Sequence, residues 1–223
     1  MNCNPFFEIE PSFRRLFVFG AGGFGREIAW LVGQSWGAAV EVVFLVDNPE
    51  YVTSPVNGVP VQLLDDVAKC DGDRFVVAVG DPQLRRRAVA GCLSAGLEPA
   101  QLVHPRVEMS RHVSLGDGCV VCAGCILTVN IVLGEHVHIN LDCTIGHDVV
   151  IGDYATLSPG VHVSGNVQIG RDVFIGTGAN IINGTACAPL VIGHGAVIAA
   201  GACVAKSVDP GVMVAGVPAV RKR

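Results

Sequence analysis

Residues 139–156 read INLDCT IGHDVV IGDYAT, three six-residue units that each begin with isoleucine. The same phase runs through residues 103–186, where every sixth residue is apolar and the residue four places later is small or β-branched. After an interruption of five residues, 187–191, the phase resumes at Ile192, Ile198 and Val204. Self-similarity at one fixed period is the signature of a repeat architecture.

A period of six residues fits neither an α-helix nor a heptad coiled coil. It predicts short strands joined by tight corners, with three units closing a triangular coil and successive coils stacked about 4.8 Å apart. The large apolar residue of each unit then points into the prism, and the small residue lets the corner close. Pairs such as Gly152-Asp153 and Gly170-Arg171 suit the corners. Residues 101–223 are therefore predicted to form a parallel β-helix of hexapeptide repeats.

Residues 15–100 follow another pattern. Apolar strands are expected at 16–20, 41–46 and 75–79, and they alternate with helices at about 26–32, 63–68 and 82–95. This alternation predicts a small parallel sheet with helices on its faces. Residues 1–14 are expected to form an N-terminal arm.

A glycine-rich turn joins the first expected strand to the first helix. Gly20, Gly22 and Gly25 match G-x-G-x-x-G, in which glycines admit a phosphate and a helix N-terminus offers it free N–H groups. Asp47 ends the second strand, where a dinucleotide fold binds a ribose. The strands are too few for a complete dinucleotide fold, so no NAD is expected. A glycine turn that only packs helix on strand is the alternative.

Composition narrows the class of protein. Of 223 residues, 50% are apolar and 16% charged, and the net charge of −5 with no basic stripe argues against nucleic-acid binding. No apolar run reaches the length of a membrane-spanning helix, and the first residues lack a secretory signal. The sequence thus predicts a cytoplasmic protein without membrane insertion.

Nine cysteines are present, and they are expected to be reduced. Cys119, Cys122 and Cys125 have a spacing that suggests a metal site. Cys119 and Cys125, however, fall on the small-residue phase of the repeat, so they are predicted to be apolar corner fillers on different faces. No metal is expected.

Both halves together resemble the hexapeptide-repeat sugar O- and N-acyltransferases. This family includes sialic acid O-acetyltransferases and N-acetyltransferases of nucleotide-linked 4-amino-sugars, such as UDP-bacillosamine and GDP-perosamine pathway enzymes. The motifs that carry the resemblance are Phe19-Gly20-Ala21-Gly22-Gly23-Phe24-Gly25-Arg26, Val79-Gly80-Asp81, Val103-His104-Pro105, Ile139-Asn140, Ile145-Gly146-His147-Asp148, Val163-Ser164-Gly165-Asn166 and Ala215-Gly216-Val217-Pro218-Ala219.

The resemblance implies a Rossmann-like nucleotide-sugar-binding domain over 15–100 and a left-handed β-helix acetyltransferase domain over 101–223. It also implies a homotrimer with acetyl-CoA and the active sites between subunits, and a role in polysaccharide biosynthesis. Residues expected to bind the nucleotide sugar are Gly20, Gly22, Gly23, Phe24, Gly25, Asp47, Gly80, Asp81 and Asn140. Residues expected to bind acetyl-CoA are Gly165, Ala200, Gly201, Gly216 and Pro218. The family often has His at Phe24 and Lys at Val220, and Arg221, Lys222 and Arg223 offer substitute cations for a coenzyme A phosphate.

Acyl transfer from a thioester needs a base for the nucleophile's proton and a donor for the oxyanion. His147 is the expected base, because imidazole suits proton transfer near neutral pH and Asp148 follows it to orient the ring. The family motif implies the same role. Three repeat units make one coil, which places Gly165 about 4.8 Å along the axis from His147. In the family the backbone of this glycine binds the acetyl carbonyl.

The leading hypothesis is an acetyl-CoA-dependent N-acetyltransferase that acts on a UDP- or GDP-linked 4-amino-6-deoxy-sugar by direct attack on the thioester. O-acetylation of sialic acid or another sugar is the runner-up, with the same residues. A zinc enzyme of carbonic anhydrase type, which requires three converging imidazoles, and a non-catalytic nucleotide-sensing scaffold are further alternatives.

Overall fold

The computed structural model describes residues 11, 13–52, 55–68 and 72–222. Contacts divide the chain into two compact units, residues 1–105 and 106–223. The expected N-terminal arm lies outside the described residues except for residues 11, 13 and 14. No helix among the described residues is long and apolar enough to cross a membrane.

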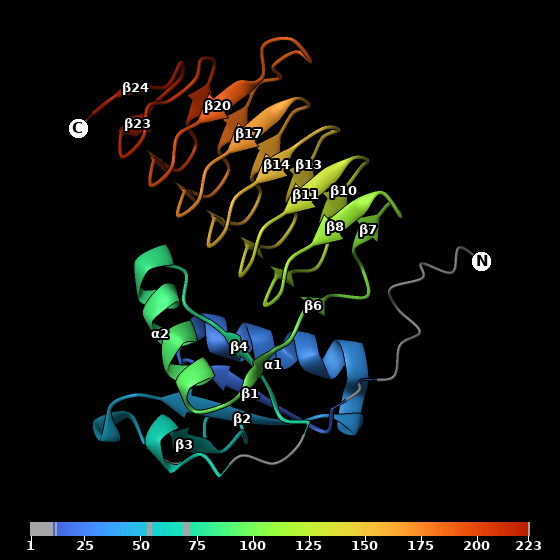
Figure 1. Cartoon of the computed structure of the whole chain (residues 1–223), viewed down its shortest axis with the longest axis vertical. Helices are drawn as coiled ribbons and strands as arrows, with labels where there is room; N and C mark the ends of the chain where they lie inside the picture. Colours follow the sequence, from blue (N-terminus) through green and yellow to red (C-terminus); the bar gives the residue numbers. More distant parts are fainter. Residues whose placement is uncertain (1–10, 12, 53–54, 69–71, 223) are drawn as a thin grey trace. The chain divides into compact units, whose positions relative to one another are not determined.

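The first unit contains a five-stranded parallel sheet with the strand order β3-β2-β1-β4-β5 (Figure 1). The elements of this unit, of which β1 to β5 form the sheet, are β1 (Arg15–Phe19), α1 (Gly23–Trp36), η1 (Gly37–Ala39), β2 (Glu41–Val46), η2 (Pro49–Tyr51), β3 (Val61–Leu63), η3 (Leu64–Asp66), β4 (Arg74–Val77), α2 (Pro82–Ser94), β5 (Glu98–Pro99) and β6 (Leu102–Val103). The central strands are buried apolar runs, as expected where helices cover a parallel sheet. The small Rossmann-like sheet is thus confirmed.

The helix expected at 63–68 is present only as a single 3-10 turn. Residues 61–63 form edge strand β3, which pairs with β2 from Phe44↔Val61 to Val46↔Leu63, and only Leu64–Asp66 turns, as a 3-10 helix. Pairing with β2 takes Leu63 into a strand, and the short segment that remains has little helical stability of its own.

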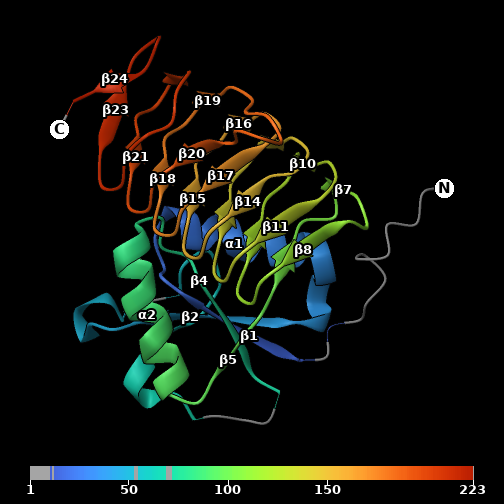
Figure 2. The same cartoon turned by 45° about the horizontal axis from the view of Figure 1, so that its top comes forward.

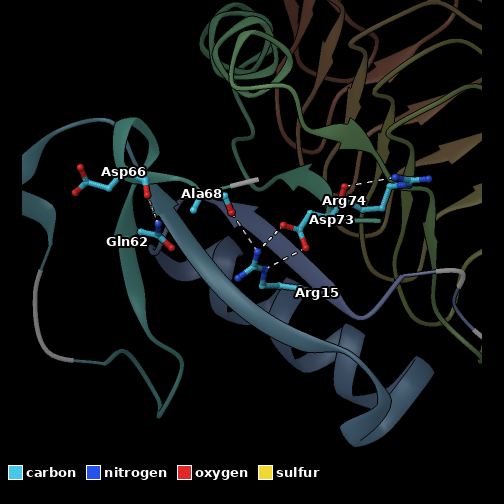
Figure 3. A network of polar contacts seen from close by, with 6 residues as sticks. All are labelled: Arg15, Gln62, Asp66, Ala68, Asp73 and Arg74. Carbon is cyan, nitrogen blue, oxygen red and sulfur yellow. Dashed lines mark hydrogen bonds and ion pairs between the residues drawn. The ribbon is translucent and has the colours of Figure 1, made fainter. Parts of the chain in front are cut away.

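An ion pair fastens the first residue of β1 to the residue before β4. Arg15 Nε donates to Asp73 Oδ1 at 3.2 Å, and Arg15 Nη2 donates to the other carboxylate oxygen (Figure 3). Arg15 Nη2 also donates to the carbonyl oxygen of Ala68 at 3.4 Å. These contacts lie at the amino ends of parallel strands, whereas the glycine turn follows the carboxyl end of β1, so they serve the fold.

The second unit is a left-handed parallel β-helix with three faces (Figure 1, Figure 2). The first face contains β7 (Glu108–Met109), β10 (Ile126–Leu127), β13 (Thr144–Ile145), β16 (His162–Val163), β19 (Asn180–Ile181) and β22 (Cys203–Val204). The second face contains β8 (Val113–Leu115), β11 (Ile131–Leu133), β14 (Val150–Ile151), β17 (Val167–Ile169) and β20 (Leu190–Ile192). The third face contains β9 (Val120–Val121), β12 (His138–Ile139), β15 (Thr156–Leu157), β18 (Phe174–Ile175), β21 (Val197–Ile198), β23 (Met213–Ala215) and the antiparallel β24 (Val220–Arg221).

Strand register confirms the six-residue period. Partners such as Leu127↔Ile145 and Ile145↔Val163 lie one coil apart, which is three repeat units. Across the interruption the partners lie further apart in the sequence, as in Ile181↔Val204. Apolar residues of both predicted phases fill the core from residue 119 to residue 181. Outside this range the phase is less reliable: Val103, Met109 and Leu115 are half-buried, and Thr185 lies exposed in the interrupting loop, where the buried Leu190 takes its place.

The corners explain why the repeat tolerates only certain residues. A left-handed backbone conformation recurs every sixth residue, as at Asn130 (φ 55°), Asp142 (φ 56°), Asp148 (φ 57°) and Asn166 (φ 56°). Asn, Asp and Gly adopt this conformation at the least cost, which accounts for their frequency at the corners.

Candidate active site

The expected catalytic pair lies at a corner between the first and second faces. His147 and Asp148 follow β13 and precede β14, and their side chains are 57% and 48% exposed. Nδ1 of His147 and Oδ2 of Asp148 are 2.8 Å apart. A carboxylate accepts a hydrogen bond, so this contact places the ring proton on Nδ1 and leaves Nε2 as the free basic nitrogen.

Asp148 is held from two sides. The amide Nδ2 of Asn130, one coil earlier at the same corner, donates to Asp148 Oδ1 at 3.0 Å. The N–H of Asp148 donates to the carbonyl oxygen of Val129 at 3.1 Å. The hydrogen bond from His147, and next that from Asn130, hold the pKa of the Asp148 carboxyl below its usual value. The carboxylate is therefore ionised at neutral pH.

Gly165 lies under the imidazole ring, one coil beyond His147. A Cβ added to Gly165 would stand 2.5 Å from His147 Nε2 and 2.6 Å from Cε1. The free ring nitrogen thus faces the backbone of Gly165. Among the hydrogen bonds of the described residues none uses the Gly165 N–H, whereas its carbonyl accepts from Gly184 at 3.0 Å. A base and an unused backbone donor accordingly stand together.

The other expected ligand residues of this unit lie elsewhere. Asn140 follows β12 at the corner between the third and first faces, and its Oδ1 accepts the N–H of Leu141 at 2.9 Å. Ala200 and Gly201 lie at the same corner, after β21. Gly216 and Pro218 follow β23, with a cis bond before Pro218. One chain therefore does not bring these residues to the corner of His147 and Gly165.

In the first unit the glycine turn has the geometry of an anion site. Gly20 adopts φ 105°, and its N–H donates to Leu45 O at 2.8 Å. Gly22 precedes α1 as its N-cap, without a side-chain cap or an acidic residue in the first turn. A Cβ at Gly25 would stand 1.9 Å from the Gly20 carbonyl oxygen, so only glycine lets the helix start here. The start of α1 therefore has no side-chain cap, which suits a negatively charged ligand.

A cavity of about 470 Å³ adjoins this turn. It is lined by Phe19, Gly20, Ala21, Gly22, Leu45, Val46, Asp47, Tyr51 and Val56. Asp47 supplies the charged group of this lining. Tyr51, in η2, and Val56 were missed from the sequence, where no local pattern places them beside Asp47.

Several expected residues are not in that lining. Gly23 and Phe24 begin α1, and Gly80 follows β4. Asp81 is the N-cap of α2, and its Oδ1 accepts the N–H of Leu84 at 2.8 Å. This N-cap role is enough to explain an aspartate at position 81 without a bound ligand.

Three cysteines of the repeat serve packing. Cys119, Cys125 and Cys143 are buried, and their thiols donate to carbonyl oxygens at 3.0, 3.0 and 3.2 Å. Within the described part of the chain no three His, Cys, Asp or Glu side chains converge as metal ligands would.

Comparisons with known proteins identify the class. Residues 15–91 match the family model described as PglD N-terminal domain. The acetyltransferase domain of PglB from Neisseria gonorrhoeae FA1090, solved with acetyl coenzyme A, is 33% identical, with 94% of this chain and 100% of that chain covered and a TM-score of 0.83. The chain belongs to the hexapeptide-repeat sugar acyltransferase family, and it is an acyltransferase.

Two further solved structures are similar over nearly the whole chain. WeeI from Acinetobacter baumannii AYE is 34% identical, covering 94% of this chain and 100% of that chain, with a TM-score of 0.89. PerB from Caulobacter crescentus, in complex with CoA and GDP-perosamine, is 26% identical, covering 93% and 97%, with a TM-score of 0.81. No curated protein sequence matches the chain.

Proposed function

We propose that this protein transfers the acetyl group of acetyl-CoA to the amino group of a nucleotide-linked 4-amino-6-deoxy-sugar. The observation that carries the proposal is the corner at which Nδ1 of His147 is bonded to Asp148 while Nε2 faces Gly165. The complexes of PglB with acetyl coenzyme A and of PerB with CoA and GDP-perosamine support the donor and the class of acceptor.

The reaction follows from that geometry. The sugar amine attacks the thioester carbonyl carbon, and His147 Nε2 takes the proton that the nitrogen loses. Asp148 stabilises the imidazolium that forms, and the unused N–H of Gly165 donates to the developing oxyanion. The carbon–sulfur bond then breaks, and the imidazolium returns its proton to the leaving thiolate. The products are the amide and coenzyme A.

Measuring coenzyme A release with a thiol reagent tests the proposal. UDP- and GDP-linked 4-amino-6-deoxy-sugars and free sialic acid serve as acceptors. Turnover on one nucleotide amino-sugar supports N-acetylation, whereas turnover on sialic acid alone moves the function to O-acetylation. Release without any acceptor, or none with all three, contradicts the proposal.

The nucleotide is assigned to the cavity beside the glycine turn. The turn and the start of α1 suit the diphosphate, and the Asp47 carboxylate suits a ribose hydroxyl or a base N–H. Asp47→Ala is expected to raise the KM for the nucleotide sugar by roughly tenfold, because one hydrogen bond to a charged group contributes about 1.5–3 kcal/mol. The KM for acetyl-CoA should stay unchanged.

Steady-state kinetics with each substrate varied in turn checks this split. Asp65→Ala is the matched control, since Asp65 is an exposed carboxylate of the same unit outside the cavity. If Asp47→Ala and Asp65→Ala give the same KM for the nucleotide sugar, the assignment fails. Calorimetric binding of NAD in place of UDP or GDP would also contradict it.

We further propose that the protein is a homotrimer whose active sites lie between subunits. Two observations support this. The two groups of expected acetyl-CoA residues occupy different corners of one prism, so a second subunit is the simple way to bring them together. The second face also carries exposed, stacked valines, Val132 and Val150 on adjacent strands and Val191 further along, which associating prisms would cover.

Mixing two inactive variants tests the shared site. His147→Ala removes the base, and Ala200→Trp fills the exposed corner after β21. Random reassembly of equal amounts after mild unfolding should restore about a quarter of the wild-type sites. Half of the subunits carry an intact His147, the other half carry an intact Ala200 corner, and each site needs one of each. Light scattering gives the mass. A monomer, or no recovery from a confirmed mixed trimer, contradicts the shared site.

A further inference from the structure

A chain of three side chains crosses two coils at the corner of His147. Asn130 Nδ2 donates to Asp148 Oδ1 at 3.0 Å, and Asp148 Oδ2 is 2.8 Å from His147 Nδ1. Both carboxylate oxygens of Asp148 are therefore occupied, each by a different neighbour. The imidazole cannot rotate away from Gly165 without losing the second of these contacts.

Asn130 lies where it can brace Asp148 because of the repeat. It precedes Asp148 by one coil, and both residues adopt the left-handed conformation, with φ 55° and 57°. The same segment also binds the backbone of Asp148, since Val129 O accepts the Asp148 N–H at 3.1 Å. Asp148 is thus held at its main chain and at its side chain by two consecutive residues of the previous coil.

Water competes for the carboxylate oxygens of Asp148, so the second hydrogen bond is needed to orient them. The Asp148 side chain is 48% exposed, and an exposed carboxylate that has one partner rotates freely among water-bonded orientations. A second donor fixed to the neighbouring coil selects the orientation that points Oδ2 at the ring.

We infer that Asn130 is a positioning residue for acetyl transfer: its amide fixes the Asp148 carboxylate, which in turn fixes the tautomer and the orientation of His147. This inference rests on the proposed function. Asn130 touches no reacting atom, so its removal should lower kcat and leave both KM values unchanged.

Two substitutions remove the amide donor of Asn130, and they differ in their side effects. Asn130→Gly keeps the left-handed backbone free of strain, and Asn130→Asp keeps the shape but places a second carboxylate beside Asp148. Both are expected to lower kcat by about tenfold, since a small misplacement of a catalytic group has an effect of this order. Asp172→Gly, which changes a left-handed corner residue (φ 58°) between the second and third faces, away from both corners assigned to substrates, is the matched control and should keep wild-type kcat.

Two readouts separate positioning from a loss of stability. In an Asp148→Ala background, Asn130→Gly should cause no further loss of kcat, because the two residues act in one chain. In a carbon-13 NMR titration, Asn130→Gly should raise the pKa of the Asp148 carboxyl relative to wild type, since it removes one of the bonds that lower it. Wild-type kcat in Asn130→Gly, independent multiplicative losses, or an unchanged Asp148 pKa would each overturn the inference.

His147→Ala in the same assay distinguishes the two levels of failure. If that variant is as active as wild type, the proposed function and the role of Asn130 both fail. If it is inactive while Asn130→Gly is fully active, only the role of Asn130 fails.

Discussion

Replacing His147 by alanine is expected to lower kcat for acetyl transfer by about 10²–10⁴-fold, the usual contribution of a general base. The KM for acetyl-CoA should change by less than about twofold, because the ring acts on the proton of the acceptor amine rather than on the donor. The half-exposed side chain makes no buried contact that the fold needs, so the melting temperature should not fall. Coenzyme A release and a thermal melt on the same preparation measure both.

Gly165→Ala is expected to disturb the basic nitrogen of His147, Nε2, without removing it. Its methyl group would come 2.5 Å from His147 Nε2, and at this site the nearest atoms belong to an exposed side chain that can move, not to backbone. The protein should therefore fold, with the ring displaced and kcat lowered by roughly 10- to 100-fold. In a His147→Ala background the same substitution should have no effect on kcat. A full additional loss there would show that Gly165 acts independently of the base.

Gly25→Ala is expected to lower the free energy of unfolding of the first unit by about 3 kcal/mol, at the upper end of what overpacking costs. The added Cβ would stand 1.9 Å from the carbonyl oxygen of Gly20 and 2.9 Å from its carbon, and neither backbone atom can move without opening the glycine turn. Binding of UDP and GDP should be lost with the turn. Denaturant unfolding and calorimetry measure the two effects.

Gly33→Ala provides the control within the same helix. Gly33 lies exposed in α1, and a Cβ there would meet no atom within 4 Å. Alanine at this position should stabilise the helix by about 0.5–1 kcal/mol and leave nucleotide binding intact. Equal destabilisation by both substitutions would mean that helix α1 is sensitive to any change, and that the contact with Gly20 is not the cause.

The repeat allowed the second unit to be predicted almost residue by residue. Its period fixes which residues point inward and which residues pair between coils, so residues such as Ile145 and Val163 were placed correctly on one face. Thr185 was misplaced because the phase alone does not show where an insertion begins. In the first unit, edge strand β3 was missed and its last residue, Leu63, was assigned to a helix, because so short a segment carries too little periodicity to identify it.

The candidate site was predictable to a smaller extent. The stacking of one coil on the next correctly placed Gly165 beside His147. The same arithmetic points to Asn130 beside Asp148, but an Asn at a corner has an ordinary explanation in its left-handed backbone, so its side-chain contact went unpredicted. Tyr51 enters the cavity from a turn whose path no local pattern specifies.

The interruption of the repeat shows where this architecture can accept new chain. Each face contains one pair of partners between which the extra residues fall, at Ile169↔Ile192, Ile175↔Ile198 and Ile181↔Val204, and the strands still pair in register there. Added length is thus absorbed by one loop, which closes on itself where Thr185 and Ala188 exchange hydrogen bonds. That loop begins one coil from Gly165, since Gly184 donates to the Gly165 carbonyl. A segment grafted there would lie two coils from His147, and the scaffold around it would stay in register.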